Sequence, residues 1–387
     1  MKRIKQLSVA CLLAFALSLL FWQIGRTHAA TPSTSTSSCG GWSVVNSPNP
    51  TGSMFDYFFG VSAISTSDVW TVGEYSNAQS LTGPLIAQWN GSQWSIIPNP
   101  ATTSGSALSG VAAVASNDVW AVGQEFHIPL IEHWNGSQWS IVSSPKLKGT
   151  LNSVTAISTT DVWAVGNKLT SGVTQTLVEH WDGAQWTVVS SPNASHENTL
   201  VGVTAVDAND IWAVGKTYYN NRIHPFYTLT EHWDGTQWSI VPSPTLNTSS
   251  ALNGVAAVSS SNVYAVGYDD ISSRSPDTHS LIERWNGSKW NVVASPNNGF
   301  SELYSIAAIS ASNIWAVGDV SGSQANQTFT EHWDGKHWSI VASPNPGSGD
   351  NELLGVAAVP STQNVWAVGF YDPNPSSNSQ TLTEYYC

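Results

Sequence analysis

Four short apolar runs, separated by turn residues, repeat along the chain from about residue 40 to its end. The first is built of small and β-branched residues, as in 254–258; the second reads Val-Trp-Ala-Val-Gly. The third and fourth read Thr-Leu-Thr-Glu-His-Trp (228–233) and Trp-Ser-Ile-Val (238–241), with Asp234-Gly235 between them. Runs of this length and composition predict β-strands, and the Asp-Gly pair predicts a tight hairpin.

The second run begins with an Asp/Asn-Val/Ile-aromatic signature that occurs seven times. Its aromatic residues are Trp70, Trp120, Trp163, Trp212, Tyr264, Trp315 and Trp366. A period near fifty residues, in which every copy reads as strands, predicts a propeller and excludes a helical solenoid. We therefore predict an all-β fold, a seven-bladed β-propeller of four-stranded antiparallel blades over residues 39–387.

The two ends of the repeated region complete each other. Residues 39–45 read as a fourth strand without its first three, and residues 382–387 read as a third strand without its fourth. We therefore predict that the N-terminal strand closes the ring as the outer strand of the last blade. Cys39 and Cys387 would then share one hairpin turn, and they are the only cysteines after residue 30, so we predict a disulfide between them.

The N-terminal residues differ from the rest of the chain. Residues 1–30 combine a basic start, a long apolar run and an alanine-containing exit, which predicts a secretory signal peptide. The apolar run is long for a signal peptide, so an uncleaved membrane anchor is the alternative. Residues 31–38 form a Ser/Thr linker without core-forming side chains. We expect a secreted or cell-surface-anchored bacterial protein.

Removal of residues 1–30 takes away four of the 13 basic residues and none of the 26 acidic ones, so the exported chain has a net charge of −17. That charge makes nucleic acid and anionic membrane surfaces poor partners. A membrane contact is expected only through an uncleaved N-terminal segment. We expect a monomer.

The recurring Trp, His and Glu side chains sit at fixed positions of the repeat. The 19 tryptophans outside residues 1–30 all fall at three such positions, which indicates blade packing instead of a sugar-binding surface. The third-strand His, as His232, has no nearby second ligand, so we expect neither a metal nor another cofactor. The third-strand Glu, as Glu231, is expected to be hydrogen-bonded within its own blade.

Candidate binding residues lie on the face that carries the variable loops, because loops diverge while the scaffold holds still. Blade four has an aromatic and basic stretch at 216–227, and blade five has residues 268–274; these two blades are neighbours. The alternative is ordinary loop packing. Residues 54–58 lead into blade one and form another aromatic patch. The candidate residues are Tyr218, Tyr219, Arg222, His224, Tyr227, Asp269, Asp270 and Arg274; we assign no catalytic residue.

The repeat, Asn-Asp-Val-Trp-Ala-Val-Gly followed by Trp-Asp-Gly-x-x-Trp, resembles bacterial propeller repeats related to the Asp-box (BNR, sialidase-like), tectonin and kelch/galactose-oxidase groups. The resemblance covers residues 39–387 and departs from an Asp-box where Asp234 adjoins Gly235 directly. Sialidases of that group use an arginine triad drawn from around the ring. Here the three arginines after residue 30, Arg222, Arg274 and Arg284, all fall in blades four and five. Galactose oxidase needs a Tyr joined to a Cys, and both cysteines are assigned to the disulfide.

These observations favour a non-catalytic propeller that binds a glycan or an extracellular protein on its variable-loop face. A divergent sialidase-like glycoside hydrolase or lyase, using for example Asp269 or Asp270 with Tyr218 or Tyr219, is the first alternative. A structural cell-envelope protein is the second, and it is favoured if residues 1–30 remain attached.

Overall fold

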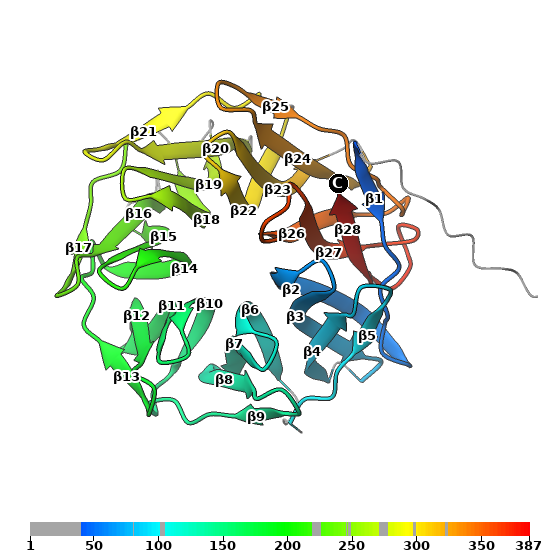
Figure 1. The fold of residues 1–387 in the computed structure, drawn as a ribbon, viewed down its shortest axis with the longest axis horizontal. Coiled ribbons are helices and arrows are strands. Elements are labelled where there is room, and N and C mark those ends of the chain that lie inside the picture. The colour runs from blue at the N-terminus through cyan, green and yellow to red at the C-terminus, as the bar shows by residue number, and fades with distance from the viewer. Residues whose placement is uncertain are drawn as a thin grey trace, which may run out of the picture. The chain divides into compact units, whose positions relative to one another are not determined.

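The structure is a computed structural model, and it describes residues 40–79, 81–100, 105–218, 226–244, 246, 249–270, 278–296, 299–321 and 324–387. The strands of residues 39–387 form seven four-stranded antiparallel sheets arranged in a ring (Figure 1), which confirms the predicted seven-bladed propeller. Among the described residues, no helix has the length and apolar character needed to span a membrane.

The strands follow the chain from the axis outwards in each blade. Blade one holds β2 (Ser53–Ser65), β3 (Asp68–Asn77), β4 (Thr82–Trp89) and β5 (Trp94–Ile96). Blade two holds β6 (Ser106–Ala115), β7 (Asp118–Glu125), β8 (Ile128–Trp134) and β9 (Trp139–Ile141). Blade three holds β10 (Gly149–Ser158), β11 (Asp161–Thr170), β12 (Val173–Trp181) and β13 (Trp186–Val189). Blade four holds β14 (Glu197–Asp207), β15 (Asp210–Tyr218), β16 (Phe226–Trp233) and β17 (Trp238–Ile240).

The last three blades follow the same order. Blade five holds β18 (Ser250–Ser259), β19 (Asn262–Asp270), β20 (Thr278–Trp285) and β21 (Trp290–Val293). Blade six holds β22 (Ser301–Ser310), β23 (Asn313–Ser321), β24 (Asn326–Trp333) and β25 (Trp338–Ile340). Blade seven holds β26 (Asn351–Ala358), β27 (Val365–Tyr371), β28 (Gln380–Tyr386) and, from the other end of the chain, β1 (Trp42–Val44).

The predicted closure of the ring is confirmed. Strand β1 pairs antiparallel with β28, with Trp42 opposite Tyr386, so it is the outer strand of blade seven. The C-terminus lies beside β1 in Figure 1. The Gly40 amide donates a hydrogen bond to the Cys387 carbonyl at 2.7 Å. Cys39 lies outside the described residues, so the disulfide stays a prediction.

Three aromatic rings meet at each seam, the contact between neighbouring blades. The second-strand ring of one blade packs on the third- and fourth-strand rings of the next, as Trp70 packs on Trp134 and Trp139 with centroids 5.1 and 5.5 Å apart. The other clusters are Trp120 with Trp181 and Trp186, Trp163 with Trp233 and Trp238, Trp212 with Trp285 and Trp290, Tyr264 with Trp333 and Trp338, Trp315 with Tyr386 and Trp42, and Trp366 with Trp89 and Trp94. The recurring tryptophans are therefore packing residues of the scaffold.

The third-strand glutamates also lie at the seams, and the expectation that they bond within their own blade is wrong. Glu231 of blade four is fully buried and accepts a hydrogen bond at 2.8 Å from Ser191, which follows the fourth strand of blade three. Three equivalent pairs are Ser144 with Glu179, Ser243 with Glu283 and Ser295 with Glu331. Each of these Ser residues precedes a Pro that recurs in the repeat, and it reaches the next blade because the chain leaves the outer strand there toward that blade. Each pair therefore joins two blades.

The third-strand histidines are bound within their own blades. The His232 ring Nε2 lies 2.8 Å from an Asp210 carboxylate oxygen at the start of the second strand, and His133 and His180 make the same contact with Asp118 and Asp161. Each ring also lies beside the second-strand Trp, as His232 lies 4.4 Å from Trp212. These histidines are accounted for by blade structure.

Candidate functional site

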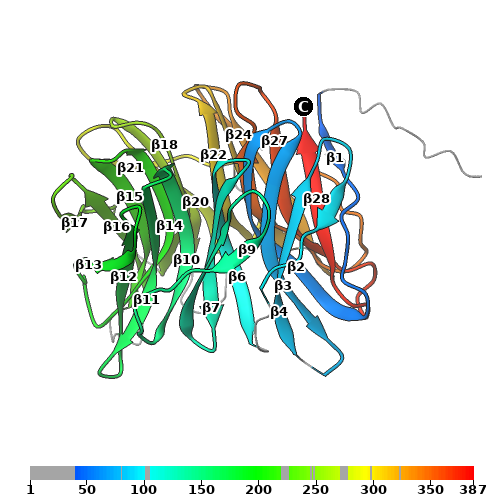
Figure 2. The same ribbon diagram turned by 60° about the horizontal axis from the view of Figure 1, so that its bottom comes forward.

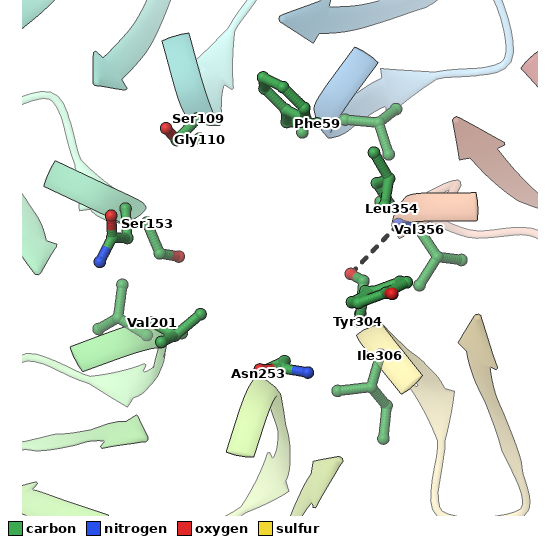
Figure 3. Close-up of a pocket in the computed structure, with 18 of the residues that line it drawn as sticks. Phe59, Ser109, Gly110, Ser153, Val201, Asn253, Tyr304, Ile306, Leu354 and Val356 are labelled. Carbon is green, nitrogen blue, oxygen red and sulfur yellow. Dashed lines mark hydrogen bonds between the residues drawn. The ribbon is translucent and has the colours of Figure 1, made fainter. Parts of the chain in front are cut away.

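Each inner strand carries a β-bulge, and the extra residue lines the central channel. In blade six, the pairing register shifts between Leu303 and Ser305, which leaves Tyr304 as the extra residue. The seven extra residues are Phe59, Ser109, Asn152, Val201, Asn253, Tyr304 and Leu354. All seven line a cavity of about 440 Å³ on the axis of the ring (Figure 3).

The residues on either side of each bulge repeat, whereas the bulged residue does not. Before it stands a fully buried Leu in six blades and Phe58 in the other. After it stands a Gly or a Ser, because the inner strands approach closely here; a Cβ on Gly110 would lie 3.1 Å from the Ser153 Cα. The scaffold therefore fixes the channel wall and leaves only the bulged side chain to vary.

Two further positions vary in the same way at the variable-loop end of each blade. They are the residue before the buried Leu or Phe and the residue after the second-strand Gly. In blades two to five the inner-strand position holds Ala or Thr, whereas Tyr57, Glu302 and Glu352 stand there in blades one, six and seven. Their second-strand partners in the register are Glu74, Asp319 and Phe370. Acidic side chains at these two positions thus occur only in three consecutive blades, six, seven and one.

We call these residues the aromatic–acidic arc: Tyr57, Phe59, Glu302, Tyr304, Asp319, Glu352 and Phe370. The Tyr57 and Phe59 rings are stacked, with centroids 6.2 Å apart and planes 8° apart. Phe370 meets Tyr57 edge-on at 4.7 Å. Figure 3 shows Phe59, Leu354 and Tyr304 following one another along one side of the channel, with Ser153 and Val201 on the other side. The arc therefore gives the channel one aromatic side.

The arc carboxyl groups have few counter-charges. Burial, with a smaller contribution from the nearby Asp319, Asp350 and Asp372, raises the pKa of Glu352 to about 7, and one hydrogen bond donated by Asn326 at 3.0 Å opposes this rise. Burial likewise raises the pKa of Glu302, which accepts a hydrogen bond from Asn253 at 3.1 Å. A carboxyl group that lacks a cation partner is less easily ionised, and it can still pair with a positively charged group of a ligand.

Tyr304 and Asp319 form a hydrogen-bonded pair within the arc. Asp319 is only 5% exposed, and burial raises its pKa to about 6 although the Tyr304 hydroxyl donates a hydrogen bond to it. Burial and the neighbouring carboxyl groups raise the pKa of Tyr304 well above its usual range. The pair can donate and accept hydrogen bonds, but the raised pKa makes Tyr304 a poor general base.

A second pocket, of about 350 Å³, adjoins the arc at blades four to six. Glu302 and Asn253 line it together with Lys216, Phe226 and Asp270. The Lys216 ammonium lies 5.0 Å from the centre of the Phe226 ring, in the range of a cation–π contact. Among the described residues, no group of three or more His, Cys, Asp or Glu side chains is arranged to hold a metal ion.

No protein-family model and no curated protein matches this chain. Its structure is similar to solved propellers. A structure of YCF48 bound to a D1 peptide covers 90% of this chain and 96% of its own, with a TM-score of 0.55 and 14% identity. YCF48 from Cyanidioschyzon merolae covers 90% and 99%, with a TM-score of 0.54 and 15% identity.

A third similar structure is an ulvan lyase of polysaccharide lyase family PL25, bound to a saccharide of GlcA and Rha3S units. It covers 87% of this chain and 95% of its own, with a TM-score of 0.55 and 11% identity. At such identities the matches show the seven-bladed propeller fold alone. They do not choose among the Asp-box, tectonin and kelch groups that the sequence resembles.

The structure describes four of the eight predicted site residues. Tyr218 ends β15, Tyr227 lies in β16 opposite Thr217, and Asp269 and Asp270 end β19. Asp270 lines the 350 Å³ pocket together with Lys216 and Phe226 of blade four, which are not among the predicted site residues. Tyr219, Arg222, His224 and Arg274 lie outside the described residues, so their part in a site stays a prediction.

Sequence reasoning anticipated the aromatic stretch at 54–58 but missed the acidic part of the arc. The available signal was a departure from the repeat: Glu302 and Glu352 stand where blades two to five have Ala or Thr. Tyr304 and Asp319 give no comparable signal, since their positions differ in almost every blade. Only the register shift shows that the bulged residue reaches the channel.

Proposed function

We propose that this chain is a secreted or cell-surface, non-catalytic binding module that takes a glycan or an extracellular protein at the variable-loop mouth of its central channel. The observation that carries the proposal is the bulged position. Six different side chains, Phe, Ser, Asn, Val, Tyr and Leu, occupy the seven positions, while the flanking residues repeat. Side chains that vary on a concave surface, held by a wall whose other residues repeat, are typical of a recognition site.

The similar propellers support both ligand classes. One was solved with a peptide and one with a saccharide, and both have the fold described above. Stacked Tyr57 and Phe59 rings and the amide and carboxyl groups of the mouth provide the contacts that either ligand requires. Secretion is proposed on residues 1–30, and N-terminal sequencing of the exported protein tests it.

The experiment is a glycan array and an extracellular-protein pull-down, run with the wild-type protein and with a Glu302→Gln/Tyr304→Ala/Glu352→Gln variant. The proposal expects a ligand that the wild type retains and the variant loses, while both unfold at the same temperature. Retention of every ligand by the variant would place binding elsewhere and contradict the proposal. Failure of the wild type to retain any ligand would favour the structural cell-envelope alternative.

A lyase or hydrolase is the second candidate, and the Tyr304–Asp319 pair beside Glu302 is the observation that favours it. Its test is the ultraviolet absorbance of unsaturated ends and the release of reducing ends from acidic polysaccharides. Asp269→Asn, Asp270→Asn and Tyr304→Phe variants must each be compared with the wild type. Product formation that one of them abolishes would replace the non-catalytic proposal. Equal inactivity of all proteins would exclude this candidate for those substrates.

A further inference from the structure

The aromatic–acidic arc has the composition of a site for a cationic side chain. Phe370 and Tyr57 meet edge-on at 4.7 Å, and Glu352 stands opposite Phe370 in the strand register. Glu352 belongs to blade seven, which lies in the ring between blade six with Tyr304 and blade one with Tyr57 (Figure 1), so its strand stands between the two aromatic parts of the arc. Aromatic faces and a carboxylate together attract a guanidinium or an ammonium group, the faces through their quadrupole and the carboxylate through its charge.

The charge around this carboxyl is unbalanced within the described residues. Asp319, Asp350 and Asp372 all act on Glu352, and Glu302 is affected by it in turn. Lys216 is the one cation in the described part of the chain whose charge acts on an arc carboxyl, and it acts on Glu302. Amide donors from Asn253 and Asn326 stabilise the carboxyl groups without neutralising them. A cation from a ligand would complete the site.

A second acidic position lies next to the first. Asp270 and Glu302 line the 350 Å³ pocket of blades four to six with one cation, Lys216, so that carboxyl groups outnumber ammonium groups among its described lining residues. Asn253 lines both this pocket and the central channel. A ligand that follows the mouth from blade seven to blade five therefore meets two carboxyl-containing hollows. A small ion fits this arrangement poorly, because the described carboxyl groups do not converge on one point. A chain with more than one positive side chain fits it well.

We propose that the ligand of the channel mouth is a basic peptide segment, with one Arg or Lys side chain held by the aromatic–acidic arc and another by the pocket lined by Asp270 and Glu302. This inference rests on the proposed binding function and names its ligand class. The net charge of −17 expected for the exported chain adds long-range attraction for such a segment. A neutral glycan would use the aromatic rings but leave the carboxyl groups without a partner.

The test uses a fluorescein-labelled peptide of Gly-Ser-Arg repeats and two matched peptides in which Gln or Glu replaces each Arg. Binding is measured by fluorescence polarisation with the full exported protein. We expect the Arg peptide to bind at least about tenfold more tightly than the Gln peptide and the Glu peptide not to bind. Raising the salt concentration from about 20 mM to about 150 mM should weaken binding of the Arg peptide, since screening shortens the range of the electrostatic attraction.

Variants separate the arc from charge in general. Glu352→Gln and Glu302→Gln should each weaken the affinity for the Arg peptide about tenfold. The Tyr57→Phe variant, which keeps the aromatic ring, should bind the Arg peptide more tightly than the Tyr57→Ala variant. Glu125→Gln is the matched control, because Glu125 ends the second strand of blade two on the same face and its loss makes the same charge change. It should bind like the wild type.

The outcomes distinguish this inference from the proposed function. In one outcome, the protein binds the Arg and Gln peptides equally, or binds a neutral glycan, and Glu352→Gln weakens that binding. This result would overturn the basic peptide as the ligand class and would still support the channel mouth as the binding site. If Glu125→Gln and Glu352→Gln weaken Arg-peptide binding equally, net charge alone explains the binding, and the aromatic–acidic arc is not the site of the cationic side chain. Absence of Arg-peptide binding by a folded wild type would overturn the inference, and the array and pull-down then decide the proposed function separately.

Discussion

Two sets of glutamates in this propeller, one fully buried at the seams and one half-buried at the channel mouth, have similarly raised pKa values and different roles. Burial raises the pKa of Glu231 at a seam to about 8 and that of Glu352 at the channel mouth to about 7. Glu231 has equivalents in five other blades and receives a hydroxyl from the neighbouring blade. Glu352 has an equivalent only in Glu302 and stands among other carboxyl groups and aromatic rings.

The comparison shows that a perturbed carboxyl does not by itself mark a functional site. The seam glutamates satisfy a packing requirement that each blade imposes on the next, so they recur with the repeat. No such requirement applies to the mouth glutamates, since Ala or Thr serves at the same position in blades two to five. Seam changes should therefore alter stability, and mouth changes should alter binding.

The largest effect is expected at the closing blade. Reduction of the predicted Cys39–Cys387 bond, or a Cys39→Ser/Cys387→Ser variant, should lower the free energy of unfolding by up to about 5 kcal/mol, because the bond closes almost the whole exported chain. Denaturant unfolding with and without reductant measures it, and intact mass shows whether the bond forms. Unchanged stability on reduction, in a protein whose mass shows two free thiols, would contradict the disulfide.

A seam tryptophan should matter almost as much. Trp212→Ala removes a nearly fully buried ring from the cluster with Trp285 and Trp290, and should cost about 3–5 kcal/mol of unfolding free energy. Phe59→Ala, at the mouth, is the comparison and should cost much less, because Phe59 lies on the channel wall. Equal losses in the two variants would remove the distinction between seam and mouth.

Glu231→Ala should lower the free energy of unfolding by a smaller amount, about 1–3 kcal/mol, because it leaves a cavity and removes an acceptor of the Ser191 hydroxyl. Glu231→Gln keeps an acceptor of nearly the same shape and should lose less. Thermal unfolding of both variants, beside Glu352→Ala, measures the difference. A Glu352→Ala variant that is destabilised more than Glu231→Ala would reverse the assignment of the two glutamates.

The seam glutamates also set the direction of the pH dependence. Burial raises the pKa of Glu132 to about 8. Asn99 stands where four other blades have the donating Ser, and it donates to the Pro84 carbonyl instead. A carboxyl whose folded pKa exceeds the ordinary 4.5 holds its proton in the folded chain after the unfolded chain has lost it. The resulting stability is complete below about pH 4.5 and disappears as the pH rises toward about 8.

Urea unfolding between about pH 5 and about pH 8 tests this expectation, and the unfolding free energy should fall across the range. Glu132→Gln should flatten the dependence, because glutamine has no proton to lose. An unfolding free energy that rises with pH in the wild type would contradict the neutral seam carboxyls.

The sequence alone was sufficient for the fold, including the pairing of Trp42 with Tyr386 across the two ends, because each blade repeats its strand and turn residues. It was insufficient for the direction of the Ser–Glu bonds, which depends on where the outer strand leaves the blade. It also missed Tyr304 at the channel, because strand alternation does not reveal a bulge. Of the predicted site residues that the structure describes, Asp270 lines the 350 Å³ pocket, whereas Tyr218, Tyr227 and Asp269 are not among its lining residues.

The assignment of the mouth as the binding surface is tested most directly by hydrogen exchange with and without the Arg peptide, read by mass spectrometry. Figure 2 shows the ring turned by 60°, with inner strands such as β2, β6 and β22 running through its thickness. We predict slower exchange on binding at residues 57–60, 302–305 and 352–355, and no change at the Asp234-Gly235 hairpin or its equivalents. Protection confined to those hairpins or to the outer strands would contradict the account.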